Sequence, residues 1–538
     1  MRFHPLILNL PFVLAFGSSA ALQAAPDAQE KTPAQPNFLF IAVDDLNTCV
    51  GYLANEPGNL LGTLFPDPDR RNAFAASLTP NLNRLASESR VFSRSFTASP
   101  LCGPSRTALL TGVPTHRSGY YQHSESFRDY PNLREVTTLP QYLRQNGYFT
   151  AGVGKIFHKP RREFRGDRVI DWPDSTLSWD SFVFRQHGVQ RHPDDVAPRY
   201  SLPWDTYIHY GRTLTQTEVA ADYVNVSHIA RLLGEGRSTL MDDEGIVREV
   251  TLPTDQPFFL AAGIFQPHLP WKTPTEFFDR VPIEDLQVTR ELMDSWLADL
   301  DDVPEAGREW TTASPTGGNE YRRFLDRAVA MDGAGADLQT LREMIQAYLA
   351  CVAFADHCIG ALIDALNSGP HAADTVVILW SDHGYHLGEK SRMGKTALWD
   401  EADRNVLLIR DPQIGANDGR FCRSAVSLQD LYPTVVARAG LPLPIQVSGE
   451  DLAPLLQDPQ ARRREPVLTT WLRGNHAVRD DRWCLIHYVN GTEEFYDDLN
   501  DPDQHLNLVA RSDYAEEIAR LRNSLPDYDS VSMVPGEE

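Results

Sequence analysis

Cysteine is scarce in this sequence of 538 residues. The six cysteines are too few and too scattered for a disulfide scaffold, and no Cys-x-x-Cys pair suggests a zinc site. Two of them, Cys351 and Cys358, lie two turns apart in a helical pattern, roughly 10 Å by helix rise, which is too far for a bridge. With 42% hydrophobic residues, the chain can nevertheless bury a large core.

Basic residues are also fewer than acidic ones, with 50 Lys and Arg against 73 Asp and Glu, so the formal net charge is -23. This balance argues against a general nucleic-acid binder, because neutralising phosphates needs a basic surface. If the ligand is an anion, positive charge must be concentrated locally.

The apolar run near the N-terminus is too short for a comfortable membrane span. Residues 1–25 combine an early Arg, this apolar run and a stretch of small residues, which is the layout of a secretory signal peptide. Residues 26–36 read as a flexible lead-in. We therefore expect an exported periplasmic or extracellular protein without a stable membrane anchor; the alternative is an uncleaved N-terminal anchor.

Alternating strands and helices predict an α/β sandwich with functional groups at the carboxyl ends of the strands. The expected strands are short and apolar, over residues 37–43, 148–154, 257–265 and 375–380. The first and last of these are continuously apolar, which is typical of buried parallel strands. Helical patterns cover residues 79–89, 137–147 and 341–369. Thr79 stands at the expected N-cap position of the first of these helices. Pro104-Ser105 is expected to start another helix.

Past about residue 460 the pattern changes to short strands joined by tight turns. Asn490-Gly491 is placed as the tip of a hairpin. We therefore predict a main domain over residues 37–460 and a small antiparallel C-terminal subdomain over residues 461–538.

A pair of polar residues follows each of two expected strands: Asp44-Asp45 after the first and Asp382-His383 after the last. Carboxylates gathered in one pocket repel by about 4 kcal/mol per pair at about 4 Å and an effective dielectric constant of about 20. A hard divalent ion such as Ca²⁺ or Mg²⁺ would resolve the repulsion. Taken alone, an Asp at a strand end is more often a helix cap or a turn former.

Cys102 precedes a helix whose N-terminal N–H groups can face an anion, and Arg106 lies one turn further on. Such a thiol would have a lowered pKa. As a cysteine nucleophile it would need a histidine base, and none has an obvious local placement. For a lone cysteine the ordinary interpretation is a buried structural residue.

The run from Cys102 to Arg106, CGPSR, followed by TALLTG, resembles the signature of the type I sulfatases, in the alkaline phosphatase superfamily. Further segments have counterparts in the same order along nearly the whole mature chain: NFLFIAVDDLN, TPNLNRLA, GVGKIFH, QPHLPW, SDHGYHLGE, DLYPTVVARAGLP, GEDLAPLL and EFYDDLNDP. The sequence is similar in particular to the iduronate-2-sulfatase branch, through GKIFH and the Asp-His pair.

The resemblance implies an alkaline-phosphatase-like sandwich, in which a large mixed, mostly parallel sheet lies between helices. It also implies that a maturation enzyme oxidises Cys102 to formylglycine. One oxygen of the hydrated aldehyde would attack sulfur, and the other would later expel sulfate. One Ca²⁺, in preference to Mg²⁺, would be held by Asp44, Asp45, residue 102 and Asp382, with His383 at the remaining ligand position.

The resemblance further assigns roles to cationic side chains. Arg106 would hold the diol or its neighbouring ligands, and Lys155 and His158 would contact the diol and sulfate. His268 would protonate the leaving alcohol as general acid. Lys395 would bridge sulfate and the leaving oxygen.

These residues predict a sulfatase that acts on a sulfated glycan or sugar, with a 2-O-sulfated uronic acid as the expected unit. Two alternatives stay open at this point. One is a phosphonate or phosphate ester hydrolase on the same scaffold, and the other is a glycan-binding protein without activity. The complete set of reactive side chains speaks against the second.

Overall fold

The computed structural model describes Met1 and residues 35–531, with gaps at 125, 159–161, 166–167, 172–173, 184–209, 242–244, 246, 313–337 and 415–418. Residues 35–538 form one compact unit. Apart from Met1, Gln35 and Pro36, the predicted signal peptide (1–25) and lead-in (26–36) lie outside the described residues. These boundaries, and the one at residue 460, stay predictions.

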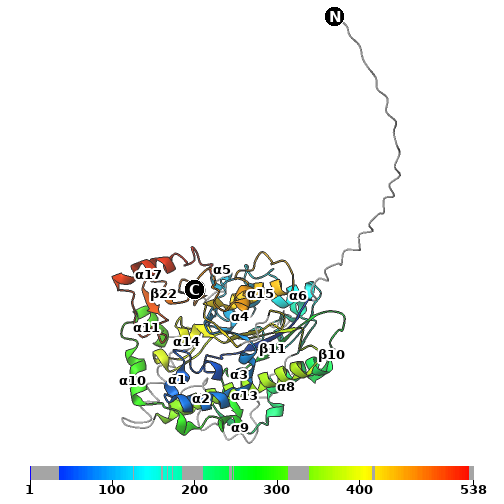
Figure 1. Ribbon diagram of the computed structural model, residues 1–538, viewed down its shortest axis with the longest axis horizontal. Helices are drawn as coiled ribbons and strands as arrows, with labels where there is room; N and C mark the ends of the chain where they lie inside the picture. Colours follow the sequence, from blue (N-terminus) through cyan, green and yellow to red (C-terminus); the bar gives the residue numbers. More distant parts are fainter. Residues whose placement is uncertain are drawn as a thin grey trace, which may run out of the picture. The chain divides into compact units, whose positions relative to one another are not determined.

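An eight-stranded sheet organises the described residues (Figure 1). Its strands lie in the order β18 (Phe421–Cys422), β2 (Arg90–Phe92), β17 (Leu407–Arg410), β13 (Thr375–Ser381), β1 (Asn37–Val43), β11 (Phe258–Ile264), β4 (Phe149–Gly154) and β7 (Ser181–Val183). Only β17 runs antiparallel to its neighbours, so the predicted mixed, mostly parallel sheet is confirmed. Val43 pairs with both Ile264 and Ser381, which brings three carboxyl ends to one edge.

Strand β1 shows how one apolar segment serves two cores. Successive side chains of a strand point to opposite faces of the sheet. One face therefore receives Leu39, Ile41 and Val43, and the other Phe38, Phe40 and Ala42. All six are fully buried, which explains why the strand is continuously apolar rather than alternating.

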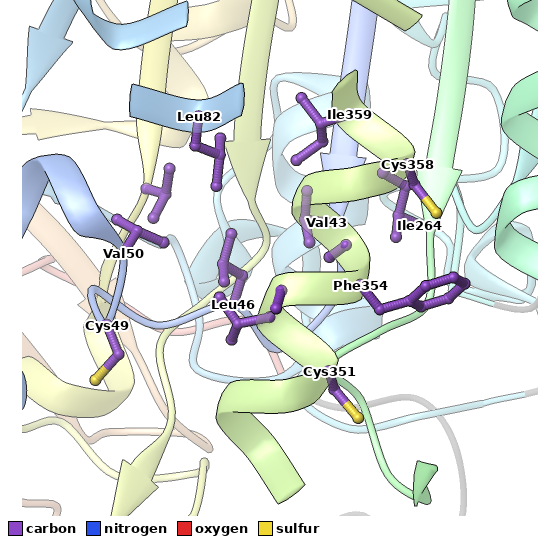
Figure 2. Close-up of a cluster of buried hydrophobic side chains, with 14 of the residues drawn as sticks. Val43, Leu46, Cys49, Val50, Leu82, Ile264, Cys351, Phe354, Cys358 and Ile359 are labelled. Carbon is purple, nitrogen blue, oxygen red and sulfur yellow. The ribbon is translucent and has the colours of Figure 1, made fainter. Parts of the chain in front are cut away.

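Helices cover both faces of the sheet, as predicted for the sandwich (Figure 1). The first core contains side chains from α2 (Pro68–Leu78), α3 (Pro80–Ser87), α8 (Ala221–Glu235) and α13 (Gln339–Ser368). The second contains side chains from α4 (Cys102–Thr111), α6 (Leu139–Gln145) and α15 (Leu431–Arg438). Figure 2 shows Phe354, Cys358 and Ile359 of α13 in the same cluster as Val43 and Ile264.

Helix α13 is long and apolar enough to cross a membrane by length and composition, but most of its apolar window is buried inside the protein. It is therefore a core helix. Its cysteines Cys351 and Cys358 are both free, like the other four, in line with the absence of a disulfide scaffold.

A separate four-stranded antiparallel sheet contains β20 (Val467–Thr470), β21 (His476–Arg479), β22 (Trp483–His487) and β23 (Glu493–Asp497). The predicted small C-terminal sheet is thus confirmed. Gly491, with φ of 83°, lies in the turn between β22 and β23, where the sequence predicts the hairpin tip. Helix α17 (Ala515–Arg522) packs against this sheet through Ile518 and Leu521.

The remaining elements are short. The helices are α1 (Leu60–Leu64), α5 (Thr115–Ser118), α7 (Ser175–Ser178), α9 (Thr275–Phe278), α10 (Arg290–Ala298), α11 (Glu305–Thr312), α14 (Asp400–Asp403) and α16 (Ala453–Gln457). The strands are β3 (Ser95–Phe96), β5 (Arg162–Arg165), β6 (Arg168–Asp171), β8 (Tyr210–Thr213), β9 (Arg237–Met241), β10 (Val247–Thr251), β12 (Trp271–Pro274), β14 (His386–Leu387), β15 (Met393–Gly394), β16 (Arg404–Asn405) and β19 (Val426–Ser427).

Two helix starts differ from the sequence prediction. Helix α4 begins at Cys102 rather than at Pro104, so the cysteine itself lies in the first turn. Thr79 occupies the N-cap position of α3, but its hydroxyl accepts a hydrogen bond from Gly51 instead of capping the helix. The capping acceptor is Asp356 of α13, whose carboxylate receives the backbone N–H groups of Asn81 and Leu82. A cap supplied by a distant helix leaves no local sequence signal.

Candidate active site

The candidate residues come from separate strand ends and one helix, and they meet at the carboxyl edge of the main sheet. Asp44 and Asp45 follow β1, and Asp382 and His383 follow β13; the others are Cys102 and Arg106 on α4, Lys155 and His158 after β4, His268 after β11 and Lys395 after β15. Contacts within 4 Å link the two acidic pairs to each other and to Cys102. The predicted convergence is therefore present.

Cys102 lies fully buried at the centre of these contacts. Its Sγ is 3.0 Å from Lys395 Nζ, 3.3 Å from His383 Nε2 and 3.9 Å from Asp45 Oδ1. Although burial raises it, the ammonium groups of Lys155 and Lys395 lower the pKa of the Cys102 thiol well below its usual value. The environment thus stabilises negative charge at residue 102.

Arg106 ties the two acidic pairs together. Its Nε donates to Asp382 Oδ2 at 2.8 Å, and its second terminal nitrogen donates to Asp44 Oδ1 at 3.0 Å. The guanidinium also donates to the backbone carbonyls of Lys155 and Ile156. Because the side chain is fully buried, these partners fix it in place, and it holds the neighbouring carboxylates rather than facing an open space.

Asp45 is held in a strained backbone conformation, with φ of 60°. Its N–H donates to Asp382 Oδ1 at 3.1 Å, and its carbonyl accepts from the hydroxyl of Tyr348 at 2.8 Å. These bonds leave the Asp45 carboxylate free to contact Lys395 at 2.6 Å. Tyr348, on α13, was not a candidate because an aromatic residue in a long apolar helix reads as core.

The electrostatics of the acidic residues differ in direction. Burial raises the pKa of Asp382 to about 7 even though Arg106 opposes the shift. For Asp44, burial raises the pKa, but Lys155, His268 and Arg106 together lower it below its usual range. Buried carboxylates this close together repel unless cations lie between them.

His383 faces the acidic residues through Nε2, which is 3.4 Å from Asp45 Oδ1 and 3.6 Å from Asp382 Oδ2. Its other ring nitrogen, Nδ1, is 2.9 Å from the carbonyl of Gly384. Burial lowers its pKa, but the Asp382 carboxylate outweighs this and raises it to about 9. The ring is thereby oriented with one nitrogen toward the carboxylates, as a ligand would be.

Lys155 reaches the site because the chain turns at Gly154, where φ is 68°. A Cβ at Gly154 would collide with the carbonyl oxygen of Gly263 on the neighbouring strand, so only glycine fits. After this turn, the Lys155 ammonium forms an ion pair with Asp44 and lies buried. The turn at Gly154 thus directs Lys155 into the site.

His158 also points to the centre, since its side-chain hydrogen bond helps to lower the pKa of Cys102. Its ring stacks on that of His123, with centroids 3.7 Å apart and an angle of 6° between the planes. Ligand atoms of His123, His158 and Cys102 lie within 4.8 Å of one another. Sequence reasoning missed His123, which lies in an irregular loop with no motif around it.

His268 approaches from the segment after β11, with its Nδ1 2.6 Å from the carbonyl of Leu269. Burial lowers its pKa, but the Asp45 carboxylate outweighs this and the net shift is upward. Asp222 of α8 fixes the start of the segment by accepting the N–H groups of Phe265 and Gln266 at 3.0 and 2.9 Å. Asp222 was not predicted, because its role depends on helix α8 packing against β11.

The arrangement suits both a hard cation and an anion. Atoms of Asp44, Asp45, Cys102 and His268 form one group within 4.8 Å, and Cys102, Asp382 and His383 form another. Carboxylate oxygens are the ligands that Ca²⁺ and Mg²⁺ prefer. The cationic side chains around residue 102 would attract an anionic group to the same point.

Known proteins resemble this chain along most of its length. A family model described as Sulfatase matches residues 36–441, and one described as N-sulphoglucosamine sulphohydrolase, C-terminal, matches residues 388–530. A sulfatase of Formosa agariphila is 31% identical over 92% of this chain and 87% of its own length. Iduronate 2-sulfatase of Mus musculus is 28% identical over 82% of this chain and 75% of its own length.

Among solved structures, the phosphonate monoester hydrolase of Agrobacterium radiobacter has a TM-score of 0.63 at 20% identity, covering 91% of this chain and 94% of that one. At this identity, the likeness concerns the fold alone.

Proposed function

Because the chain belongs to the sulfatase family and is a sulfuric ester hydrolase, we propose that it removes sulfate from a sulfated carbohydrate. The observation that carries the proposal is the buried Cys102, which lies within 4 Å of Lys395, His383 and Asp45. A glycan-binding protein has no need for this complete set of reactive groups. The relative named iduronate 2-sulfatase supports a 2-O-sulfated uronic acid as the sugar unit.

We propose that a maturation enzyme converts Cys102 to formylglycine, whose hydrate supplies the nucleophilic oxygen for attack on sulfur. The protein contributes the surroundings. Lys395 and His158, which contact residue 102, would hold the sulfate group against it. Position 102 in the first turn of α4 also exposes it to the positive end of the helix dipole.

The donor set fits a calcium ion. The carboxylates of Asp44, Asp45 and Asp382 converge beside residue 102, and the repulsion between them is what a divalent cation would relieve. His383, with Nε2 toward the carboxylates, would complete the set. The bound ion would supply Lewis acidity at a sulfate oxygen. Arg106, which contacts two of the carboxylates, would orient them for it.

His268 is suited to protonate the leaving sugar oxygen. Its raised pKa favours the protonated ring, and the bond from Nδ1 to the Leu269 carbonyl leaves the other nitrogen for the substrate. Lys155 would add positive charge against the sulfate oxygens. Together these residues would place positive charge where the leaving group and sulfate develop negative charge.

The substrate test is a screen of desalted enzyme against defined sulfated mono- and disaccharides, with released sulfate as the readout. We expect 2-O-sulfated uronides to be cleaved. Cleavage at another position only would refute the assignment of the sugar. Faster turnover of an aryl phosphonate than of the matching aryl sulfate would refute sulfate esters as the preferred substrate.

The maturation test is mass spectrometry of the peptide that contains residue 102. An active preparation should contain formylglycine there, and an active preparation with only cysteine would refute the conversion. We also propose that residues 1–25 direct export and are removed, so the N-terminus of the secreted protein should lie close after Ala25.

A further inference from the structure

A cluster of arginine side chains lies beside the C-terminal sheet and contains none of the candidate active-site residues. Arginines outnumber acidic residues by five to three in the lining of a hollow of about 320 Å³. The five are Arg462, Arg463, Arg464, Arg482 and Arg520. Two of the five pair with carboxylates outside this lining, Arg463 with Asp430 and Arg482 with Asp497, so the donors left for a ligand belong to Arg462, Arg464 and Arg520.

Three separate segments build the hollow: the run before β20, the turn between β21 and β22, and helix α17. Two aspartates of the turn hold the arginines in place. Asp481 accepts from Arg462 while its other oxygen accepts from the Ala425 N–H. Asp480 accepts from Arg520 while its other oxygen accepts from the Trp483 N–H. Each aspartate is anchored to the backbone, so it fixes where Arg462 and Arg520 pair in the absence of a ligand.

Three of the five arginines, Arg462, Arg464 and Arg520, retain donors for an anion. A guanidinium has five N–H donors, and Arg462 and Arg520 each spend one terminal nitrogen on their aspartate. Arg464 forms no side-chain hydrogen bond or ion pair with the part of the chain that the structure describes. Side chains of Arg462 and Arg520 are 73% and 50% exposed, and ion pairs this exposed contribute little, about 0 to 1 kcal/mol. An incoming anion therefore displaces little.

We propose that this hollow binds an anionic sugar unit of a sulfated glycan, at a distance along the chain from the sulfate that is hydrolysed. The inference rests on the proposed function, which supplies the polyanionic substrate. Guanidinium groups pair with sulfate and carboxylate oxygens through paired N–H donors. The volume lies at the lower end of the range for ligand pockets, which suits a single sugar residue with its anionic group.

The test measures binding by calorimetry in a Cys102→Ala background, where no turnover occurs. The probes are a hexasaccharide of alternating uronic acid and amino sugar with one sulfate per sugar, and its desulfated counterpart. The test variant carries Arg462→Gln, Arg464→Gln and Arg520→Gln. The matched control carries Arg70→Gln, Arg84→Gln and Arg212→Gln, which remove exposed paired arginines elsewhere.

We expect the test variant to bind the sulfated hexasaccharide at least about tenfold more weakly, and the control to stay within about twofold. Equal losses in both variants, or no loss in either, would overturn the proposal. Equal affinity for the desulfated probe would show that the hollow binds the carboxylate groups of the probe, and it would overturn sulfate as the ligand.

The same substitutions in an active Cys102 enzyme separate this site from catalysis. Turnover of a small aryl sulfate should be unchanged, because none of the substituted arginines belongs to the candidate active site, and a loss of this turnover would contradict a separate site. Failure of the unsubstituted enzyme to cleave any sulfate ester would instead refute the proposed function, while the binding result would stand by itself.

Discussion

Lys395 lies 3.0 Å from the sulfur of residue 102, and it also pairs with Asp45 at 2.6 Å. Although burial lowers its pKa, the carboxylates around it raise the value well above normal, so the ammonium stays charged. A fixed positive charge in a buried site is worth far more than one at the surface.

We therefore predict that Lys395→Ala lowers kcat/KM for an aryl sulfate by about a hundredfold or more. Lys395→Arg should recover part of the loss, because it restores the charge but not the geometry. Steady-state kinetics measures both, with circular dichroism as the folding control. Activity of the alanine variant within a few-fold of wild type would contradict the role.

His268 leads to a prediction about the leaving group. An aryl oxygen with a low pKa leaves without a proton, whereas a sugar hydroxyl needs one. His268→Ala should therefore slow hydrolysis of a sugar sulfate by about 10²-fold or more, and of a nitrophenyl sulfate much less. Asp222→Ala, which frees the segment holding His268, should show the same pattern more weakly. Equal losses on both substrates would indicate a general structural effect.

Residues within motifs were within reach of sequence reasoning, since Cys102, Arg106 and the two acidic pairs stand next to strand or helix ends. Sequence reasoning could not find three other residues of the site, His123, Asp222 and Tyr348. Each acts through a neighbour that is remote along the chain, such as the ring of His158 or the backbone of Asp45. Such contacts exist only after the elements have packed.

At the scale of elements, the stability that comes from the contact between α13 and the start of α3 should depend on pH. Burial raises the pKa of Asp356 to about 6 from its ordinary value of 3.8, although Leu82, Asn81 and the Asn81 side chain donate to the carboxylate. The folded state therefore holds this proton at a pH where the unfolded chain has released it. Stability from this group is greatest at low pH and falls as the pH rises through 3.8 to 6.

Relative to Asp356→Asn, which does not titrate, wild type should lose about 2 kcal/mol of unfolding free energy between pH 4.5 and pH 7.5. Urea unfolding of both proteins across this range measures the difference, and effects of all other groups cancel. A difference that stays flat with pH would show that Asp356 has an ordinary pKa in the folded protein.

Strands were easier to predict from the sequence than helix starts. Strands β1 and β13 match the predicted segments almost residue for residue, because apolar continuity marks burial on both faces. The start of α4 at Cys102 was missed because Pro104 is a strong start signal, yet proline is equally acceptable within the first turn.

At the scale of the whole molecule, the C-terminal sheet joins the rest of the protein through buried polar contacts with the loop before α4 and with α14. Thr470 N donates to the carbonyl of Ala98, just before the Cys102 segment. Arg479 of β21 is fully buried and forms ion pairs with Asp400 at 3.1 Å and Asp403 at 2.7 Å. The sequence shows a change of pattern near residue 460, but it does not show that ion pairs connect the residues before this point to those after it.

Loss of Arg479 should destabilise the whole of residues 35–538, because two carboxylates would remain buried without their partner. We predict that Arg479→Leu lowers the unfolding free energy by about 3 to 5 kcal/mol, and that adding Asp403→Asn recovers part of it. Arg511→Leu, at an exposed pair, should cost at most about 1 kcal/mol. Calorimetry should show one shifted transition; an early second transition would mean that the C-terminal sheet unfolds independently, and the contact would then contribute little to the active-site domain.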